Sequence, residues 1–182
     1  MSFGEKILDY KEEIIADLGE LIAIQSVTGI QEGCKEALDW MMKKAISFGL
    51  KAESFDNVAG HVEIGEGGKL CGVLSHLDVV PEGNNWDSLP FELSVGDNGY
   101  MYGRGVADDK GAALINLYCL RALKDNGVVG KNTLRAIFGT NEERGMTDMD
   151  TYFQYEPVPD LSITPDSEYG ICKGEKGIIQ LE

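Results

Sequence analysis

The sequence predicts an α/β layer fold, because strand-like and helix-like segments alternate along its 182 residues. The clearest strand is the run Leu-Cys-Gly-Val-Leu at 70–74, which is continuously apolar and bounded by turn residues, as fully buried central strands are. The clearest helices are 31–48 and 110–125, where apolar side chains recur every three or four residues. The length is that of one ordinary domain.

The first part of the chain is expected to hold two helices and two short strands. Residues 5–24 form the first predicted helix, with aliphatic side chains at helical spacing: Ile7, Leu8, Ile14, Ile15, Leu18, Leu21 and Ile22. In the second helix, near 31–48, the inward side chains are Leu38, Met41, Met42, Ala45 and Ile46. Strands are expected near 51–56 and 59–64, ended by a glycine-rich turn.

After the buried strand, the pattern predicts a loop, a hairpin and a further alternation of helices and strands. These fall at 81–90 (polar loop), around 97–99 (hairpin), 110–125 (helix), 133–138 (strand), 146–155 (helix) and 161–164 (strand). The last residues, 176–182, have the pattern of a strand that is just beginning.

Composition narrows the classes of partner. Sixteen Lys and Arg against 31 Asp and Glu give a net charge of −15, which disfavours nucleic acid and favours a cation. No apolar run approaches the roughly 20 residues that a membrane span needs. Four widely spaced cysteines without a C-x-x-C pair indicate free thiols, with Cys71 and Cys119 as small buried side chains. We therefore expect a cytoplasmic protein with no nucleic-acid or membrane partner.

Four short polar segments lie where predicted strands end or where a predicted helix begins. They contain His76 and Asp78, Asp108 and Asp109, Glu142 and Glu143, and Asp166. Each has a structural alternative when taken alone: a hydrogen-bonded histidine, a helix cap, a solvated acidic loop and a rigid loop after a proline. Because ligands of α/β sheets bind beyond the carboxyl ends of strands, the four together favour one shared site.

The residue types suggest a metal ion. Imidazole and carboxylate ligands suit Zn²⁺, with Mn²⁺ or Co²⁺ as substitutes, better than Ca²⁺ or a thiolate-bound metal. Phosphate binding is not supported at Gly103–Gly111, because Asp108 stands at the third glycine position of a G-x-G-x-x-G pattern. In an extended chain His76 and Asp78 point to the same side, so the carboxylate could orient the imidazole.

Together the four segments resemble those of the co-catalytic zinc exopeptidases, the family of glutamate carboxypeptidase, aminoacylase, acetylornithine deacetylase and succinyl-diaminopimelate desuccinylase. The resemblance rests on Ser-His-Leu-Asp-Val-Val-Pro at 75–81, Gly103–Gly111, Asn141-Glu142-Glu143 and Pro165-Asp166. Xaa-dipeptidases of the PepV type, which include enzymes that cleave β-Ala-His, are most similar at 139–143, 166–169 and 174–178. The family fold implies a three-layer α/β/α catalytic domain with a mixed central sheet.

The resemblance also implies roles for six residues. His76 and Asp166 would bind one zinc ion and Glu143 the other, and Asp108 would bridge both. Asp78 would orient His76. Glu142 would be the general base, taking a proton from a water activated by two metals and delivering it to the leaving amine. The peptide bond between Asp108 and Asp109 is expected to be cis.

Two features of the family are missing from these residues. The family has a second histidine ligand late in the catalytic domain, and a lid domain between two catalytic segments. The other histidine of this chain, His61, precedes all four segments and lies in a predicted strand, so we interpret it as structural. We therefore expect residues 1–182 to be the N-terminal part of a metallopeptidase catalytic domain, inactive alone, with the lid domain and the C-terminal catalytic segment absent.

Three functions remain open from the sequence. The leading hypothesis is a metallo-exopeptidase that hydrolyses the peptide bond of dipeptides by a water activated by two zinc ions. A deacylase or aminoacylase acting on N-acyl amino acids is the second. A non-catalytic, metal-free regulatory or binding domain is the third, although it would have no need to keep Asp108, Glu142 and Asp166.

Overall fold

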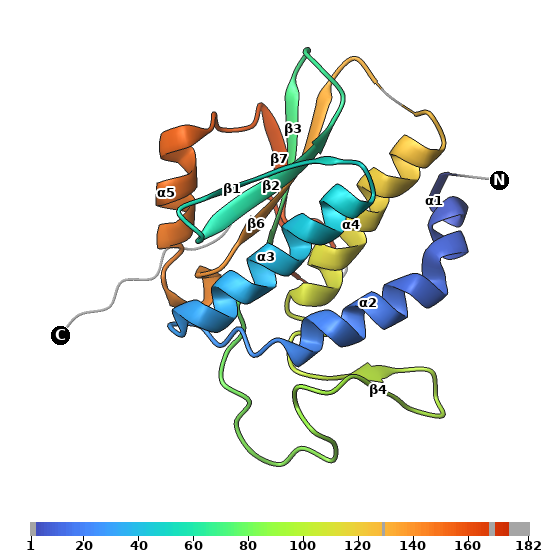
Figure 1. Cartoon of the computed structure of the whole chain (residues 1–182), viewed down its shortest axis with the longest axis vertical. Helices are drawn as coiled ribbons and strands as arrows, with labels where there is room; N and C mark the ends of the chain where they lie inside the picture. Colours follow the sequence, from blue (N-terminus) through green and yellow to red (C-terminus); the bar gives the residue numbers. More distant parts are fainter. Residues whose placement is uncertain (1–2, 129, 168–169, 175–182) are drawn as a thin grey trace.

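The computed structural model describes residues 3–128, 130–167 and 170–174. Its centre is a five-stranded sheet in the order β1-β2-β6-β3-β7 (Figure 1). The strands are β1 (Lys51–Phe55), β2 (Ala59–Ile64), β3 (Leu70–His76), β6 (Thr133–Gly139) and β7 (Leu161–Ile163). Strands β6, β3 and β7 run parallel, whereas β2 is antiparallel to both β1 and β6. The expected mixed sheet is confirmed, and the parallel strands share one carboxyl edge.

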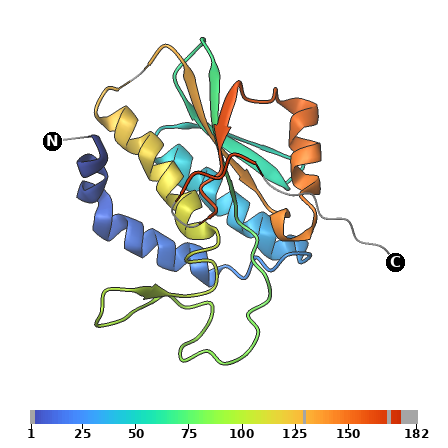
Figure 2. The ribbon, with the colours of Figure 1, turned by 180° about the vertical axis from the view of Figure 1, so that it is seen from behind.

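Helices cover both faces of the sheet. Helices α2 (Lys11–Ala23), α3 (Gln31–Ser47) and α4 (Lys110–Asp125) lie on one side, and α5 (Thr147–Tyr155) lies on the other (Figures 1 and 2). Successive side chains of β6 point to opposite faces of the sheet, so they pack against different helices. Ala136 and Phe138 pack into the core with α2, α3 and α4, whereas Ile137 packs with Tyr152 of α5.

Most predicted elements occur within one residue of their expected bounds, from the helix at 31–48 to the strand at 161–164. The hairpin around 97–99 consists of the two-residue strands β4 (Ser94–Val95) and β5 (Met101–Tyr102), and 81–90 forms a loop without helix or strand. The strand expected at 176–182 lies outside the described residues. None of the helices among the described residues is long and apolar enough to cross a membrane.

The predicted single helix at 5–24 is wrong at its start. The chain forms a short α1 (Phe3–Lys6), then the 3-10 turn η1 (Ile7–Tyr10), and only then α2. Leu8, one of the aliphatic side chains at helical spacing in the predicted helix, is 67% exposed. The Tyr10 hydroxyl donates to Asp125 Oδ2, and its ring contacts that of Tyr118, so this residue packs on α4 instead of continuing the helix.

Three burial predictions, for Ile46, for the strand at 70–74 and for Cys119, are also wrong. Ile46, expected inward on α3, is 60% exposed. In β3, Leu70, Cys71, Val73 and Leu74 are only half-buried, because the next strand, β7, is three residues long and itself exposed. All four cysteines are free thiols, and both Cys71 and Cys119 are half-buried.

The start of α4 is fixed by a buried lysine. Lys110 is fully buried, and its Nζ donates to the carbonyl oxygens of Leu21 at 3.0 Å and Ile24 at 2.7 Å, at the end of α2. Carbonyls at the end of a helix lack the partners that they would have inside it, so the ammonium group satisfies that of Leu21 and adds a second bond to that of Ile24, which also accepts the Ser26 N–H at 2.9 Å. A Cβ at Gly111 would lie 2.1 Å from the carbonyl oxygen of Val106, so only glycine fits there. Both features hold the loop that carries Asp108.

Candidate metal centre

The four polar segments meet at the carboxyl edge of the parallel strands. His76 ends β3, Glu142 and Glu143 form the turn η2 (Glu142–Arg144) after β6, and Asp166 follows β7. Asp108 reaches the same place from the loop before α4. The Nε2 atom of His76 lies 2.9 Å from Asp108 Oδ1, 3.5 Å from Asp166 Oδ2 and 4.0 Å from Glu142 Oε2. Residues up to 90 positions apart in the sequence thus face one point.

The donor atoms at this point fit a divalent cation. His76 is 3% exposed, and its Nε2 has no hydrogen-bond partner among the described residues, nor has the buried Oε1 of Glu143. Two sets of potential ligand atoms each lie within 4.8 Å of one another: His76, Asp108 and Asp166, and His76, Glu142 and Glu143. Buried polar atoms normally have a partner, and a bound cation would supply one to both of these atoms. One imidazole nitrogen with carboxylate oxygens is a donor set that Zn²⁺ accepts.

Asp78 contacts His76 in a way the sequence predicts only in part. The Nδ1 atom of His76 lies 2.9 Å from the backbone carbonyl oxygen of Asp78 and 3.4 Å from its carboxylate Oδ1. The backbone carbonyl is thus the shorter contact. A carbonyl or carboxylate partner on one ring nitrogen orients the other toward a metal.

The Asp78 carboxylate also makes two contacts that the sequence does not predict. It accepts hydrogen bonds from the backbone N–H of Glu142 at 3.1 Å and of Glu143 at 3.3 Å. The neighbouring residues keep it in place, since the backbone N–H of Leu77 donates to Gly139 and that of Val79 to Ser26. Asp78 therefore links the first and third segments. No local spacing signals this contact, because it joins residues more than 60 positions apart.

The Asp108–Asp109 peptide bond is cis, as the family resemblance implies. Asp109 is fully buried, and its Oδ2 accepts the backbone N–H of His76 at 3.2 Å. It occupies the N-cap position of α4, but its side chain makes no capping hydrogen bond. The prediction that the Asp109 side chain caps α4 is therefore wrong, because this side chain bonds to the end of β3 instead.

The electrostatics favour a positive ion. Burial and the charges of neighbouring carboxylates raise the pKa of Glu143, with Asp108 as the largest such neighbour. Burial, together with Asp166, raises the pKa of Asp109 to about 7. Burial lowers the pKa of His76, but its hydrogen bond to Asp78 and the nearby negative charges outweigh burial and raise that pKa to about 10. The clustered carboxylates disfavour one another's charge, which a cation would relieve.

His61 does not join this centre. It lies in β2, as predicted, and is buried toward α5, where its Nδ1 is 2.9 Å from the hydroxyl of Tyr152. Burial, and next the charge of Arg135, lowers the pKa of His61 to about 4.

Replacing His61 with Gln is expected to reduce the acid sensitivity of folding. The unfolded imidazole has a pKa of about 6.5 and the folded one about 4, so between these values only the unfolded chain takes up the proton. Stability is therefore lost as pH falls through this window, and between pH ~7 and ~4.5 the wild type should lose roughly 2–3 kcal/mol more than His61→Gln. Urea denaturation at both pH values measures this, and carboxylate titration affects both proteins alike. Equal losses would contradict the prediction.

Comparison with known proteins identifies a family for this chain. The family model described as Peptidase family M20/M25/M40 matches residues 72–178. A Beta-Ala-Xaa dipeptidase from Lactobacillus delbrueckii subsp. lactis is 40% identical over 100% of this chain and 41% of its own length. The chain thus spans about two fifths of the length of this relative.

Solved structures with a similar fold include two peptidases. Human carnosine dipeptidase 1 superposes with a TM-score of 0.79 and 20% identity, over 91% of this chain and 40% of its own. An M20 family metallo-carboxypeptidase from Sulfolobus solfataricus gives a TM-score of 0.73 and 21% identity, over 84% of this chain and 37% of its own. These likenesses support the fold. Because the family model matches more than half of its residues, the chain belongs to peptidase family M20/M25/M40.

Proposed function

We propose that the chain forms the metal-binding part of a dipeptidase that uses two zinc ions to hydrolyse the peptide bond of a dipeptide. The observation that carries this proposal is the buried Nε2 of His76, which makes no hydrogen bond among the described residues and faces carboxylate oxygens of Asp108 and Asp166. The name of the Beta-Ala-Xaa dipeptidase relative supports the substrate class. Four free cysteines are in keeping with a reducing compartment such as the cytoplasm.

Five residues would hold or position the two ions. His76, Asp108 and Asp166 would hold one ion, and Asp108 with Glu143 would hold the second, with Mn²⁺ or Co²⁺ as substitutes for Zn²⁺. Asp78 would orient His76 through its backbone carbonyl and keep η2 in place through its carboxylate. When bound, such ions acidify water and polarise a carbonyl oxygen.

Glu142 is proposed as the general base. Its carboxylate reaches the centre without being buried in it, since the side chain is 39% exposed and lies 4.0 Å from His76 Nε2. Burial raises its pKa, and the charges of Asp166 and Asp78 do so further, against the opposing effect of His76. A carboxylate with a raised pKa is a better proton acceptor, so Glu142 can take a proton from water and pass it to the leaving amine.

The proposal includes the expectation that residues 1–182 alone turn over dipeptides slowly or not at all. Among the described residues, the centre has one imidazole, whereas the family resemblance implies a second histidine and a lid. The length of the Beta-Ala-Xaa dipeptidase relative, of which this chain covers 41%, leaves room for both.

A substrate panel tests the proposed function. The full product of this reading frame and the 182-residue chain would each be loaded with Zn²⁺ and given β-Ala-His, α-dipeptides and N-acetyl amino acids. We expect the full product to prefer dipeptides and the Asp108→Asn variant to be inactive. A preference for N-acetyl amino acids would instead show a deacylase, and a protein that binds no metal would show a non-catalytic domain. Efficient turnover by residues 1–182 alone would overturn the expected inactivity.

A further inference from the structure

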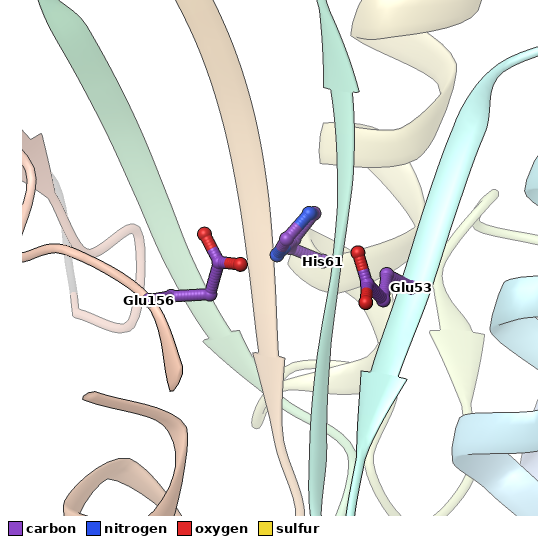
Figure 3. Close-up of side chains that lie close together, drawn as sticks. All are labelled: Glu53, His61 and Glu156. Atoms are coloured by element: carbon purple, nitrogen blue, oxygen red, sulfur yellow. The ribbon is translucent and has the colours of Figure 1, made fainter. Parts of the chain in front are cut away.

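We propose a second metal site, separate from the candidate metal centre, in which Glu53, His61 and Glu156 bind a borderline divalent ion such as Zn²⁺. One ligand atom from each residue lies within 4.8 Å of the others. Figure 3 shows the imidazole of His61 between the two carboxylates. The site is independent of the proposed function, because none of its residues belongs to the candidate metal centre.

The sheet and α5 bring these three residues together. Glu53 of β1 and His61 of β2 are directly paired across the antiparallel ladder, so their side chains lie on the same face. Glu156 follows the last residue of α5, the helix that covers this face. Donors from three elements therefore converge because of tertiary structure and not because of an acidic run in the sequence.

His61 has the contact that metal-bound histidines have on their second nitrogen. Its Nδ1 lies 2.9 Å from the hydroxyl oxygen of Tyr152, and this oxygen also accepts a hydrogen bond from Arg135 Nη1 at 3.2 Å. With Nδ1 protonated and donating to Tyr152, the lone pair of Nε2 is free for a metal ion. An oxygen partner on the other nitrogen is the usual way in which proteins orient a histidine ligand.

The charge balance leaves room for a divalent cation. Arg135 bonds to Glu63 Oε2 at 2.8 Å and to Glu156 Oε2 at 2.5 Å, which leaves Oε1 of Glu156 without that partner. Among the described residues, no hydrogen bond or ion pair involves the Glu53 carboxylate, and Lys51, the nearest lysine along β1, pairs with Glu66. Glu53, Glu63 and Glu156 thus bring three negative charges, against the one positive charge of Arg135, which pairs with Glu63 and Glu156. A divalent ion would neutralise the remaining two charges.

Such an ion would act as a structural clamp. Strand β1 lies at one edge of the sheet and, among the described residues, pairs with β2 alone. An ion shared by Glu53, His61 and Glu156 would tie this edge to β2 and to the end of α5. Because it binds only the folded state, it would stabilise the fold by mass action.

The histidine content of the chain allows a direct test. The sequence has only two histidines, so His76→Gln leaves His61 as the sole imidazole. Nitrogen-15 NMR of this variant during titration with ZnCl₂ reports on His61 alone, whatever ions the remaining carboxylates of the metal centre bind. We expect the Nε2 signal to change to that of a metal-bound nitrogen, with the proton on Nδ1. His61 signals that stay unmoved at millimolar-scale zinc would overturn the proposal.

A matched pair of variants separates coordination from general charge. Adding Glu53→Gln to the His76→Gln protein should weaken zinc binding at His61 by at least about tenfold, as loss of a metal-site partner does. Adding Glu66→Gln makes the same charge change on an exposed carboxylate that pairs with Lys51, and should leave the affinity unchanged. Equal weakening by both variants would show a diffuse electrostatic effect and would also overturn the site.

Discussion

Replacing Asp108 with Asn is expected to remove the part of the stabilisation by zinc that comes from the candidate metal centre, leaving only what the proposed site of Glu53, His61 and Glu156 provides. The wild-type protein should melt at a higher temperature with Zn²⁺ than with a chelator, because the ion binds a preformed cluster only in the folded state. At a zinc concentration of about 100 times Kd the gain is ~2.7 kcal/mol, which for a chain of this size corresponds to roughly 5–10 °C. Asn keeps the shape of Asp108 but removes the charge nearest to His76 Nε2, at 2.9 Å.

Scanning calorimetry with and without zinc measures the effect, and atomic absorption counts the bound ions. Asp97→Asn is the matched control, since Asp97 is an exposed acid in the turn between β4 and β5 and should leave the zinc shift intact. Without zinc, Asp108→Asn should melt no lower than the wild type, because one of the mutually repelling carboxylates is gone. A zinc shift in Asp108→Asn as large as that of the wild type would remove this residue from the ligand set. A melting temperature that does not respond to zinc in the wild type would contradict the metal centre itself.

The arrangement of the site could be anticipated because its residues lie at ends of regular elements. An apolar run predicts β3, and the parallel partner β6 ends at the same edge, so His76 and Glu142 have to come close. Asp166 follows from the same rule through β7. Amphipathic periodicity likewise places α4 correctly, and with it the loop that carries Asp108.

Contacts that depend on side-chain packing across the fold could not be anticipated. The bond from the Asp78 carboxylate to η2 depends on how two loops settle after β3 and β6, and nothing in either loop alone encodes it. The break between α1 and α2 depends on Tyr10 packing on α4, a contact over more than 100 positions. The neighbours of His61 come from β1, β6 and α5, so its strand was predictable while its charged surroundings were not.

Replacing Glu142 with Gln is expected to remove catalysis and leave the metal centre loaded. Gln has the same size and keeps the backbone N–H that Asp78 holds at 3.1 Å, but it cannot accept a proton at the side chain. Loss of a general base lowers turnover by about 10²–10⁴-fold. Glu142 is the proposed base and not a proposed ligand, so bound zinc should stay the same. The measurements are the rate of dipeptide hydrolysis by the full product of the reading frame and its zinc content.

Glu143→Gln is the matched control, because it makes the same chemical change one residue away. Glu143 is the proposed ligand of the second ion, and its buried Oε1 has no partner among the described residues. This variant should therefore lose zinc together with activity, whereas Glu142→Gln should lose activity alone. If Glu142→Gln also lost zinc, Glu142 would be a ligand. If Glu142→Gln kept full turnover, a group other than Glu142 would have to accept the proton from water. Because the two residues are adjacent on η2 and share Asp78 as the acceptor of their backbone N–H groups, the comparison keeps these backbone contacts constant and tests what each carboxylate does.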